Sequence, residues 1–235
     1  MTHSFRALAI GALAFGLAAC ASETDTPAPL DGASDVVEAA AEIPAGTYSL
    51  DVPHTELGFR VRHLGIANVD GAFKDFSGSI TVPESGIEGM SASLTAQVAS
   101  IETDNEDRND HLRQPEFFGA DEFPELTFET TSVVSTGGNG FTMTGDLTIR
   151  DTTLPVTLEG EYLGSAMFQG TQKIGFEASG EINRQDFGLS FAATNEAGEI
   201  IVGDTVTLMI GAEGNLEAAD ADAMMEEEPA EEAAE

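Results

Sequence analysis

Residues Leu50 to Gly78 read LDVPHTELGFRVRHLGIANVDGAFKDFSG. Between Thr55 and His63 the odd positions hold Thr, Leu, Phe, Val and His, and the even positions hold Glu, Gly, Arg and Arg. A period of two is typical of a β-strand with one buried face. Glycine and asparagine residues then interrupt the pattern before Phe73, which predicts a second strand that pairs back on the first.

The same alternation recurs along the chain as far as Ile210. It is clearest from Phe141 to Arg150, where Phe, Met, Gly, Leu and Ile occupy the odd positions and polar residues the even ones. About eight such segments fall within roughly 165 residues, which is the scale of a small closed antiparallel barrel or a sandwich. Glycines inside these segments favour a barrel with free interior volume, because a sandwich core would use β-branched residues there. They are Gly58, Gly78, Gly145, Gly160, Gly175 and Gly180.

One segment has a helical pattern, from about Asn105 to Gln114, with Thr103 or Asp104 as its N-cap. Arg108 and His111 share one face of this helix. In one interpretation the helix is a lid whose Arg108 and His111 meet the polar head of a ligand. In the other these side chains pair with neighbouring carboxylates and only anchor the lid, and this second interpretation is favoured because such ion pairs are the commoner arrangement.

Composition excludes some classes of function. Nine Lys and Arg against 42 Asp and Glu give a net charge of −33, and 46–212 alone carries 26 acidic and eight basic residues. Nucleic acid and anionic membranes are therefore poor electrostatic partners.

The sequence also lacks familiar catalytic and metal-binding motifs. The chain has no nucleophile elbow, P-loop, CxxC or HExxH pattern, and His54 and His63 would point to opposite faces of a continuous strand. The sequence thus indicates neither an enzyme nor a metal site.

The N-terminus has the pattern of an export signal. Arg6 precedes an apolar run that ends in Leu-Ala-Ala-Cys at 17–20, and this run is too short to span a membrane. The ending resembles a bacterial lipobox, so 1–19 is predicted to be a lipoprotein signal peptide and Cys20 the lipidated first mature residue. The alternative is a plain signal-peptidase site with an incidental cysteine. By resemblance to Gram-negative sorting rules, Ala21 predicts a periplasm-facing lipoprotein of the outer membrane.

Acidic, low-complexity segments flank the predicted strands. Residues 20–45 are rich in Ala, Pro, Ser, Thr and acids and are predicted to be the lipidated tether. Residues 213–235 are predicted to be a disordered acidic tail. The barrel domain is therefore predicted to occupy 46–212.

Several motifs, in order, resemble the YceI-like, polyisoprenoid-binding family. HTELGFRVRHLG and VDGAFKDFSGSITV come first, followed by SIETDNEDRNDHLRQPEFFGADEFPELTFET, MTGDLTIRDTTLPVTL, INRQDFGLS and VGDTVTL. The resemblance spans about Gly46 to Gly211. The chain departs from the family at Thr55, where serine is usual, at Tyr48, where Trp is common, and in its acidic tail.

The resemblance implies an elongated, lipocalin-like antiparallel β-barrel whose apolar tunnel binds a long isoprenoid lipid, of the quinone or polyprenyl type. It implies no cofactor beyond this lipid, and family members often form homodimers. The leading hypothesis is therefore a non-enzymatic protein that holds or shuttles such a lipid at the cell envelope. The alternatives are an enzyme or redox accessory acting on the lipid head group, and a structural envelope barrel with a packed interior. The predicted ligand contacts are Phe59, Phe73, Phe76, Phe128 and Phe176, with Arg108 and His111 at the head group.

Overall fold

The computed structural model describes residues 42–218. The predicted signal peptide, Cys20, most of the predicted tether and the last 17 residues of the predicted acidic tail, 219–235, lie outside the described residues. Within 42–218, no helix has the length and apolar content needed to cross a bilayer.

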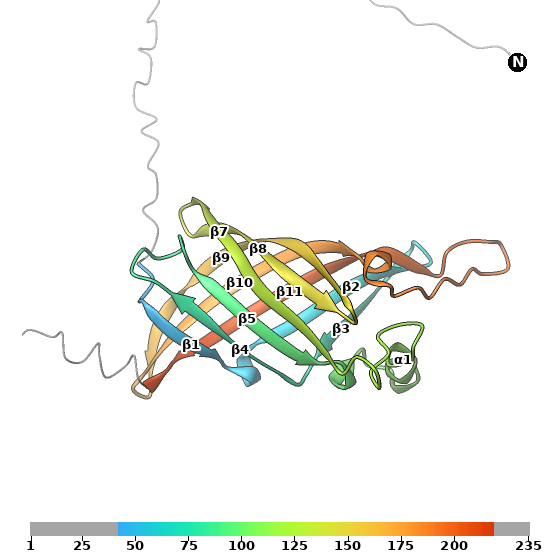
Figure 1. Ribbon diagram of the computed structural model, residues 1–235, viewed down its shortest axis with the longest axis horizontal. Helices are drawn as coiled ribbons and strands as arrows, with labels where there is room; N and C mark the ends of the chain where they lie inside the picture. Colours follow the sequence, from blue (N-terminus) through green and yellow to red (C-terminus); the bar gives the residue numbers. More distant parts are fainter. Residues whose placement is uncertain (1–41, 219–235) are drawn as a thin grey trace, which may run out of the picture. The chain divides into compact units, whose positions relative to one another are not determined.

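The described residues form strands, one α-helix and three short 3₁₀ helices (Figure 1). The strands are β1 (Gly46–Leu50), β2 (Glu56–His63), β3 (Ala67–Phe73), β4 (Phe76–Val82), β5 (Ser91–Gln97), β6 (Ile101–Glu102), β7 (Glu125–Gly137), β8 (Gly140–Ile149), β9 (Thr152–Phe168), β10 (Thr171–Asn183) and β11 (Val202–Leu216). The helices are η1 (Val52–His54), η2 (Val98–Ser100), α1 (Glu106–Leu112) and η3 (Arg184–Phe187).

Eight of the strands close into an antiparallel barrel. The sheet runs in the order β1-β4-β5-β7-β8-β9-β10-β11, and β1 closes it by pairing with β11 as well as with β4. The remaining strands extend from the other part of β11: β2 pairs with β11, β3 with β2, and β6 with β3. The predicted all-β barrel of about eight strands with one short helix is therefore confirmed.

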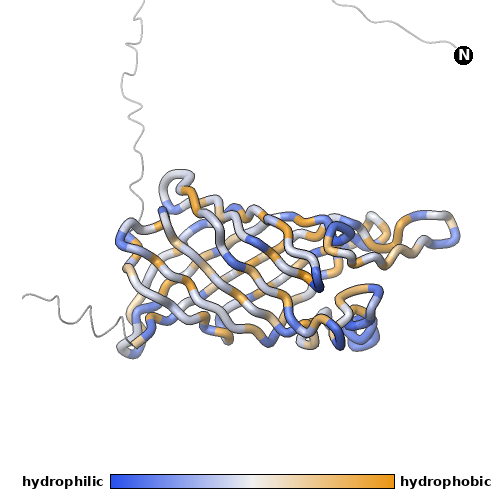
Figure 2. Tube along the Cα trace, viewed as in Figure 1, coloured by the Kyte–Doolittle hydropathy of each residue, from blue (hydrophilic) through white to orange (hydrophobic). Residues whose placement is uncertain are grey.

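Alternation along the strands decides which side chains face the interior. In Figure 2 hydrophobic and hydrophilic positions alternate along most of the barrel strands. In β8 Gly145 and the side chains of Phe141, Met143, Leu147 and Ile149 are buried, whereas the even-numbered residues between them are exposed or half-buried. This period of two is the pattern on which the sequence prediction of strands rested.

Interior glycines make room for aromatic rings. A Cβ atom at Gly145 would lie 2.2 Å from Cζ of Phe128, and one at Gly160 would lie 2.3 Å from Cζ of Phe141. Each ring therefore lies against the barrel wall in space that a larger residue would occupy. The glycines on which the barrel prediction rested thus let large rings lie at the wall, so that these rings do not fill the centre of the barrel.

One end of the barrel, near the β9–β10 and β7–β8 turns, is closed by a tightly packed core and is here named the plugged end. Tyr48, Tyr162 and Ile174 lie there, and each is at most 1% exposed. Gly214 allows this packing, because a Cβ there would lie 2.9 Å from Cβ of Tyr48. The opposite end, named the helix end, carries α1, the β2–β3 turn and the loop from Gly188 to Ile201 (Figure 1).

The hydroxyl of Tyr162 is buried without a hydrogen-bond partner among the described residues. A Tyr162→Phe variant is therefore expected to raise the free energy of unfolding by about 1 kcal/mol, because it removes an unsatisfied polar group. Urea denaturation measures the change. Tyr48→Phe is the control and should lower stability by a similar amount, since the Tyr48 hydroxyl donates to the Pro44 carbonyl at 2.8 Å. A Tyr162→Phe variant less stable than the natural chain would contradict the prediction.

The predicted element boundaries need three corrections. The barrel continues past residue 212, because β11 runs to Leu216, which pairs with Tyr48 and is buried. The predicted tether ends earlier than residue 45, since Ile43 is only 6% exposed and packs into the core. Helix α1 is shorter than predicted, and its N-cap is Asn105, whose side chain accepts from the Arg108 backbone N–H at 2.9 Å.

Candidate ligand-binding cavity

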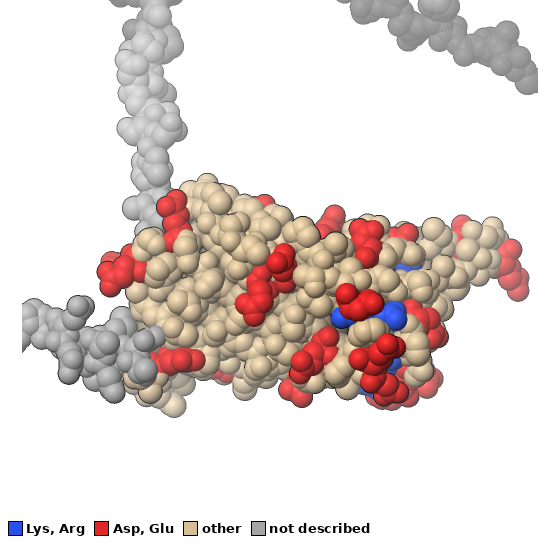
Figure 3. All heavy atoms as spheres, in the orientation of Figure 1, with Lys and Arg blue, Asp and Glu red and all other residues tan. Residues whose placement is uncertain are grey.

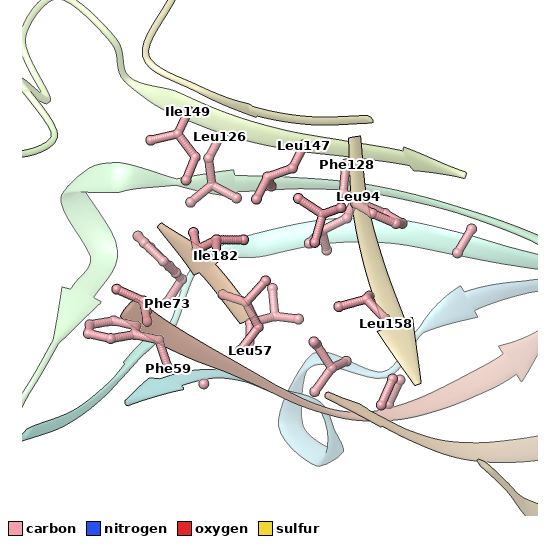
Figure 4. A pocket seen from close by; sticks show the side chains of 18 of the residues that line it. Leu57, Phe59, Phe73, Leu94, Leu126, Phe128, Leu147, Ile149, Leu158 and Ile182 are labelled. Atoms are coloured by element: carbon pink, nitrogen blue, oxygen red, sulfur yellow. The ribbon is translucent and has the colours of Figure 1, made fainter. Parts of the chain in front are cut away.

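The barrel encloses an apolar cavity of about 240 Å³ between the plugged end and the helix end. The labelled side chains in Figure 4, among them Leu57, Phe128 and Leu158, reach it from different strands. The interior of an eight-stranded barrel is either filled by side chains or holds one small ligand. Because a single water needs only roughly 10–15 Å³ of such volume, this cavity is far larger than a packing defect.

Four of the five predicted phenylalanines border the cavity. Phe59 and Phe73 come from the β2–β3 hairpin, with ring centroids 6.0 Å apart, and Phe128 and Phe176 come from β7 and β10. Phe76 does not border it and instead packs with a second buried cluster at the start of β4. Ligand contact by these five residues stays a prediction.

Aliphatic residues, which the sequence prediction of the site left out, make up much of the cavity wall. They face inward as the phenylalanines do, so the strand alternation marks them as interior residues but does not say which of them border the cavity. Those labelled in Figure 4 are Leu57, Leu94, Leu126, Leu147, Ile149, Leu158 and Ile182.

The segment from Thr103 to Pro124, here named the lid, contributes to the cavity at the helix end. Leu112, Phe117 and Phe118 of the lid border the cavity. Phe191 stacks on Phe117 with ring centroids 4.7 Å apart. Arg150 also holds the lid, because one of its guanidinium nitrogens donates to carbonyls of lid residues and of the loop at Gly188.

Arg108 and His111 lie in the lid, and neither borders the cavity. The Arg108 guanidinium donates to the hydroxyl and the carbonyl oxygen of Thr103. His111 contacts the Glu116 carboxylate at 3.1 Å, and its ring meets Phe117 and Phe191 edge-on at 5.0 Å each. The structure therefore places both residues in the anchoring of the lid and does not bring them together with the phenylalanine wall.

Arg184 is a site residue that sequence reasoning missed. It is 4% exposed and is the one charged side chain among the described residues that border the cavity. Its guanidinium donates to the carbonyls of Leu189 at 2.6 Å and Gly203 at 2.9 Å, and to the Asp204 carboxylate at 2.9 Å. The available signal was the family-like motif INRQDFGLS, which contains this arginine.

A second polar cluster lies outside the cavity, where the chain passes from β1 to β2. Side-chain atoms of Asp51, His54 and Glu213 lie within 4.8 Å of one another, which is close enough to hold a metal ion. However, the Lys173 ammonium already sits 2.8 Å from the Asp51 carboxylate and 2.6 Å from that of Glu213. The cluster is therefore a half-buried ion pair network that ties η1 to β10 and β11.

This network makes stability depend on pH. The hydrogen bond from Lys173, helped by those from His54 and Asn215, lowers the pKa of Asp51 from 3.8 to about 2. A lowered pKa in the folded state stabilises the protein above pH 3.8, and this contribution is lost as the pH falls towards 2. Urea denaturation from pH 5 to pH 2 should therefore show a weaker pH dependence for Asp51→Asn than for the natural chain. The control is Asp121→Asn, which removes a carboxylate at an exposed lid position outside this network.

The fold and the site together define a class, that of closed β-barrels with an apolar interior large enough for one small ligand. The YceI-like domain family matches residues 48–214, and the chain belongs to this family. The protein YceI of Escherichia coli is 36% identical over 148 residues, which cover 62% of this chain and 77% of that protein.

Solved structures agree with this assignment. The Campylobacter jejuni YCEI protein superposes with a TM-score of 0.58 at 34% identity, covering 72% of this chain and 96% of that one. A polyisoprenoid binding domain from Saccharophagus degradans has the same fold, with a TM-score of 0.51 at 16% identity over 72% of this chain and 98% of that domain.

Proposed function

We propose that this protein binds a long-chain isoprenoid lipid, of the quinone or polyprenyl type, in the barrel cavity and holds or shuttles it at the bacterial cell envelope. The observation that carries the proposal is the apolar cavity of about 240 Å³, bordered by aromatic and aliphatic side chains. The description of the Saccharophagus degradans domain as polyisoprenoid-binding supports the choice of ligand class. A packed structural barrel fits less well, because its interior would be filled.

The free energy of transferring the lipid from a bilayer to the cavity favours a carrier that exchanges its lipid over a protein that retains it permanently. Moving each CH₂ out of water is worth about 0.8 kcal/mol, but the lipid starts in a bilayer that is already apolar. The net transfer into the cavity is therefore small, and the lipid can be exchanged. The shape of the cavity then has to supply most of the selectivity, with few polar contacts.

Arg184 is the best-placed candidate for contact with the polar head group. It borders the cavity near the helix end, whereas Arg108 and His111 contact other parts of the lid. The Arg184 guanidinium already donates to four protein oxygens, so one of its five N–H groups remains for a carbonyl or phosphate oxygen of the lipid. A lipid bound with its tail towards the plugged end would present its head to this side chain.

The proposal includes export and anchoring. The lipobox-like LAAC sequence supports Cys20 as a lipidated residue that attaches the protein to a membrane facing the periplasm, with Ala21 favouring the outer membrane. A Cys20→Ser change should then abolish fatty-acid labelling and release the protein from the membrane fraction. Unchanged labelling would contradict the anchor and would leave the cavity proposal intact. A homodimer stays a prediction.

Lipid extraction tests the proposed function directly. The full chain is exported in a bacterial host that makes prenyl lipids, then purified, extracted with organic solvent and analysed by mass spectrometry. The expected result is an isoprenoid lipid close to equimolar with the protein. A preparation without isoprenoid that also takes up none from prenyl-lipid vesicles would overturn the proposal.

A further inference from the structure

Two exposed isoleucines lie on neighbouring segments at the helix end. Ile66 is 84% exposed in the β2–β3 turn, and Ile200 is 59% exposed at the end of the loop that precedes β11. The Leu64 backbone N–H donates to the Ile201 carbonyl at 2.9 Å, which joins the two segments. Residues 64–66 and 200–201 are here named the isoleucine tip.

The backbone fixes the position of Ile66. Leu64 and Gly65 both have positive φ values, 52° and 69°, and the Ile66 N–H donates to the His63 carbonyl at 3.2 Å. The connection between the paired residues His63 and Ala67 has three residues, and the positive φ values at the first two turn the chain back into β3. Ile66 is therefore presented to solvent by a defined turn at the end of a paired hairpin.

The isoleucine tip is continuous with the cavity. His63, next to the tip, pairs with Val202, which borders the cavity. The Val202 carbonyl accepts from the Arg184 guanidinium at 3.3 Å. At the far end, Tyr48, Tyr162 and Ile174 close the barrel. The core at the plugged end therefore leaves the helix end as the side for ligand entry in the proposed function, and the isoleucine tip lies on that side.

The charges around the tip indicate the kind of surface that it fits. Arg62 is exposed and has no ion-pair partner among the described residues, whereas Glu196 and Glu199 lie in the neighbouring loop. On the face shown in Figure 3 the basic side chains lie towards the helix end, with acidic ones among them. Mixed charges around exposed apolar side chains fit a zwitterionic surface better than an anionic one.

We propose that the isoleucine tip is a membrane-docking surface, which inserts Ile66 and Ile200 into a zwitterionic phospholipid bilayer and brings the helix end of the barrel against the source of its lipid. This rests on the proposed function, since an isoprenoid that resides in a bilayer has to leave it at the surface of that bilayer. Insertion removes both isoleucine side chains from water, which favours docking.

A single tryptophan tests the docking surface, because the natural chain has none. The reporter is introduced as Ile66→Trp, and the matched control is Met167→Trp, at a site 63% exposed near the plugged end. Each full-length variant is mixed with phosphatidylcholine vesicles whose acyl chains carry bromine, a quencher confined to the apolar layer. The expected result is blue-shifted, quenched emission at position 66 and unchanged emission at position 167. An unquenched position 66, or quenching at position 167 instead, would overturn the docking surface.

Transfer kinetics separate this inference from the proposed function. Combining Ile66→Asp with Ile200→Asp should slow the uptake of a prenyl lipid from phosphatidylcholine vesicles by roughly tenfold or more, because two apolar anchors are lost. Met167→Asp should leave the rate unchanged. If lipid co-purifies with the protein but the isoleucine tip stays in water, the docking surface is overturned and the proposed function is not. A tip that enters the bilayer while no isoprenoid is ever bound would support docking and overturn only the proposed function.

Discussion

Replacing Ala178 by tryptophan is expected to abolish lipid binding while the barrel stays folded. Ala178 lies in β10, borders the cavity and has a small side chain on the inward face of the strand. An indole there takes up much of the roughly 240 Å³ that is free, so an isoprenoid chain can no longer enter. The lipid bound per protein, measured by mass spectrometry, should fall by roughly tenfold or more.

The next residue of the same strand gives a matched control. Ser179 is exposed on the outer face of β10, so Ser179→Trp adds the same bulk outside the cavity. Both variants should keep the far-ultraviolet circular dichroism of a β-protein. Full lipid binding by a folded Ala178→Trp variant would show that the cavity is not where the lipid resides.

Arg184→Leu is expected to lower the free energy of unfolding by about 3–5 kcal/mol, because it removes one partner from a buried hydrogen-bonded network. The carbonyls of Leu189 and Gly203 lose their donors in this variant, and Asp204 loses its counter-charge. Arg184→Lys should lower the free energy of unfolding almost as much, since one ammonium cannot reproduce the planar fork of the guanidinium.

Urea denaturation measures both Arg184 variants. The control is Arg62→Leu, at an exposed position without an ion pair among the described residues, where a change within about 0.5 kcal/mol is expected. A loss below 1 kcal/mol for Arg184→Leu would mean that local rearrangement or water satisfies the carbonyls that arginine now holds.

The strands and the barrel class could be predicted because alternation is a local property of the sequence. In β8, for example, the inward positions are visible in the sequence itself. The alternation does not say which inward side chains border empty space. Phe73 and Phe76 have similar neighbours in sequence, yet only Phe73 lines the cavity, and Tyr48 faces inward but belongs to the plug. That distinction depends on how the whole barrel packs.

The polar part of the site was harder to predict for a related reason. The burial of Arg184 depends on the nearby carbonyl of residue 189 and on carbonyls at 202 and 203, which lie in β11 and are distant in sequence. Arg108 and His111 attracted attention because they share a helical face, but that face meets lid residues rather than the cavity. Sequence reasoning placed the helix correctly within a few residues and could not orient it.

The plugged end limits the length of prenyl tail that the cavity can hold. Because Tyr48, Tyr162 and Ile174 close one end, a prenyl tail can advance only until its tip meets that core. Each added isoprene unit should tighten binding until the barrel is full, and further units then remain outside at the helix end and add little. Affinity should accordingly rise with the number of isoprene units and then level off. The number of isoprene units at which the affinity levels off would therefore measure the depth of the cavity.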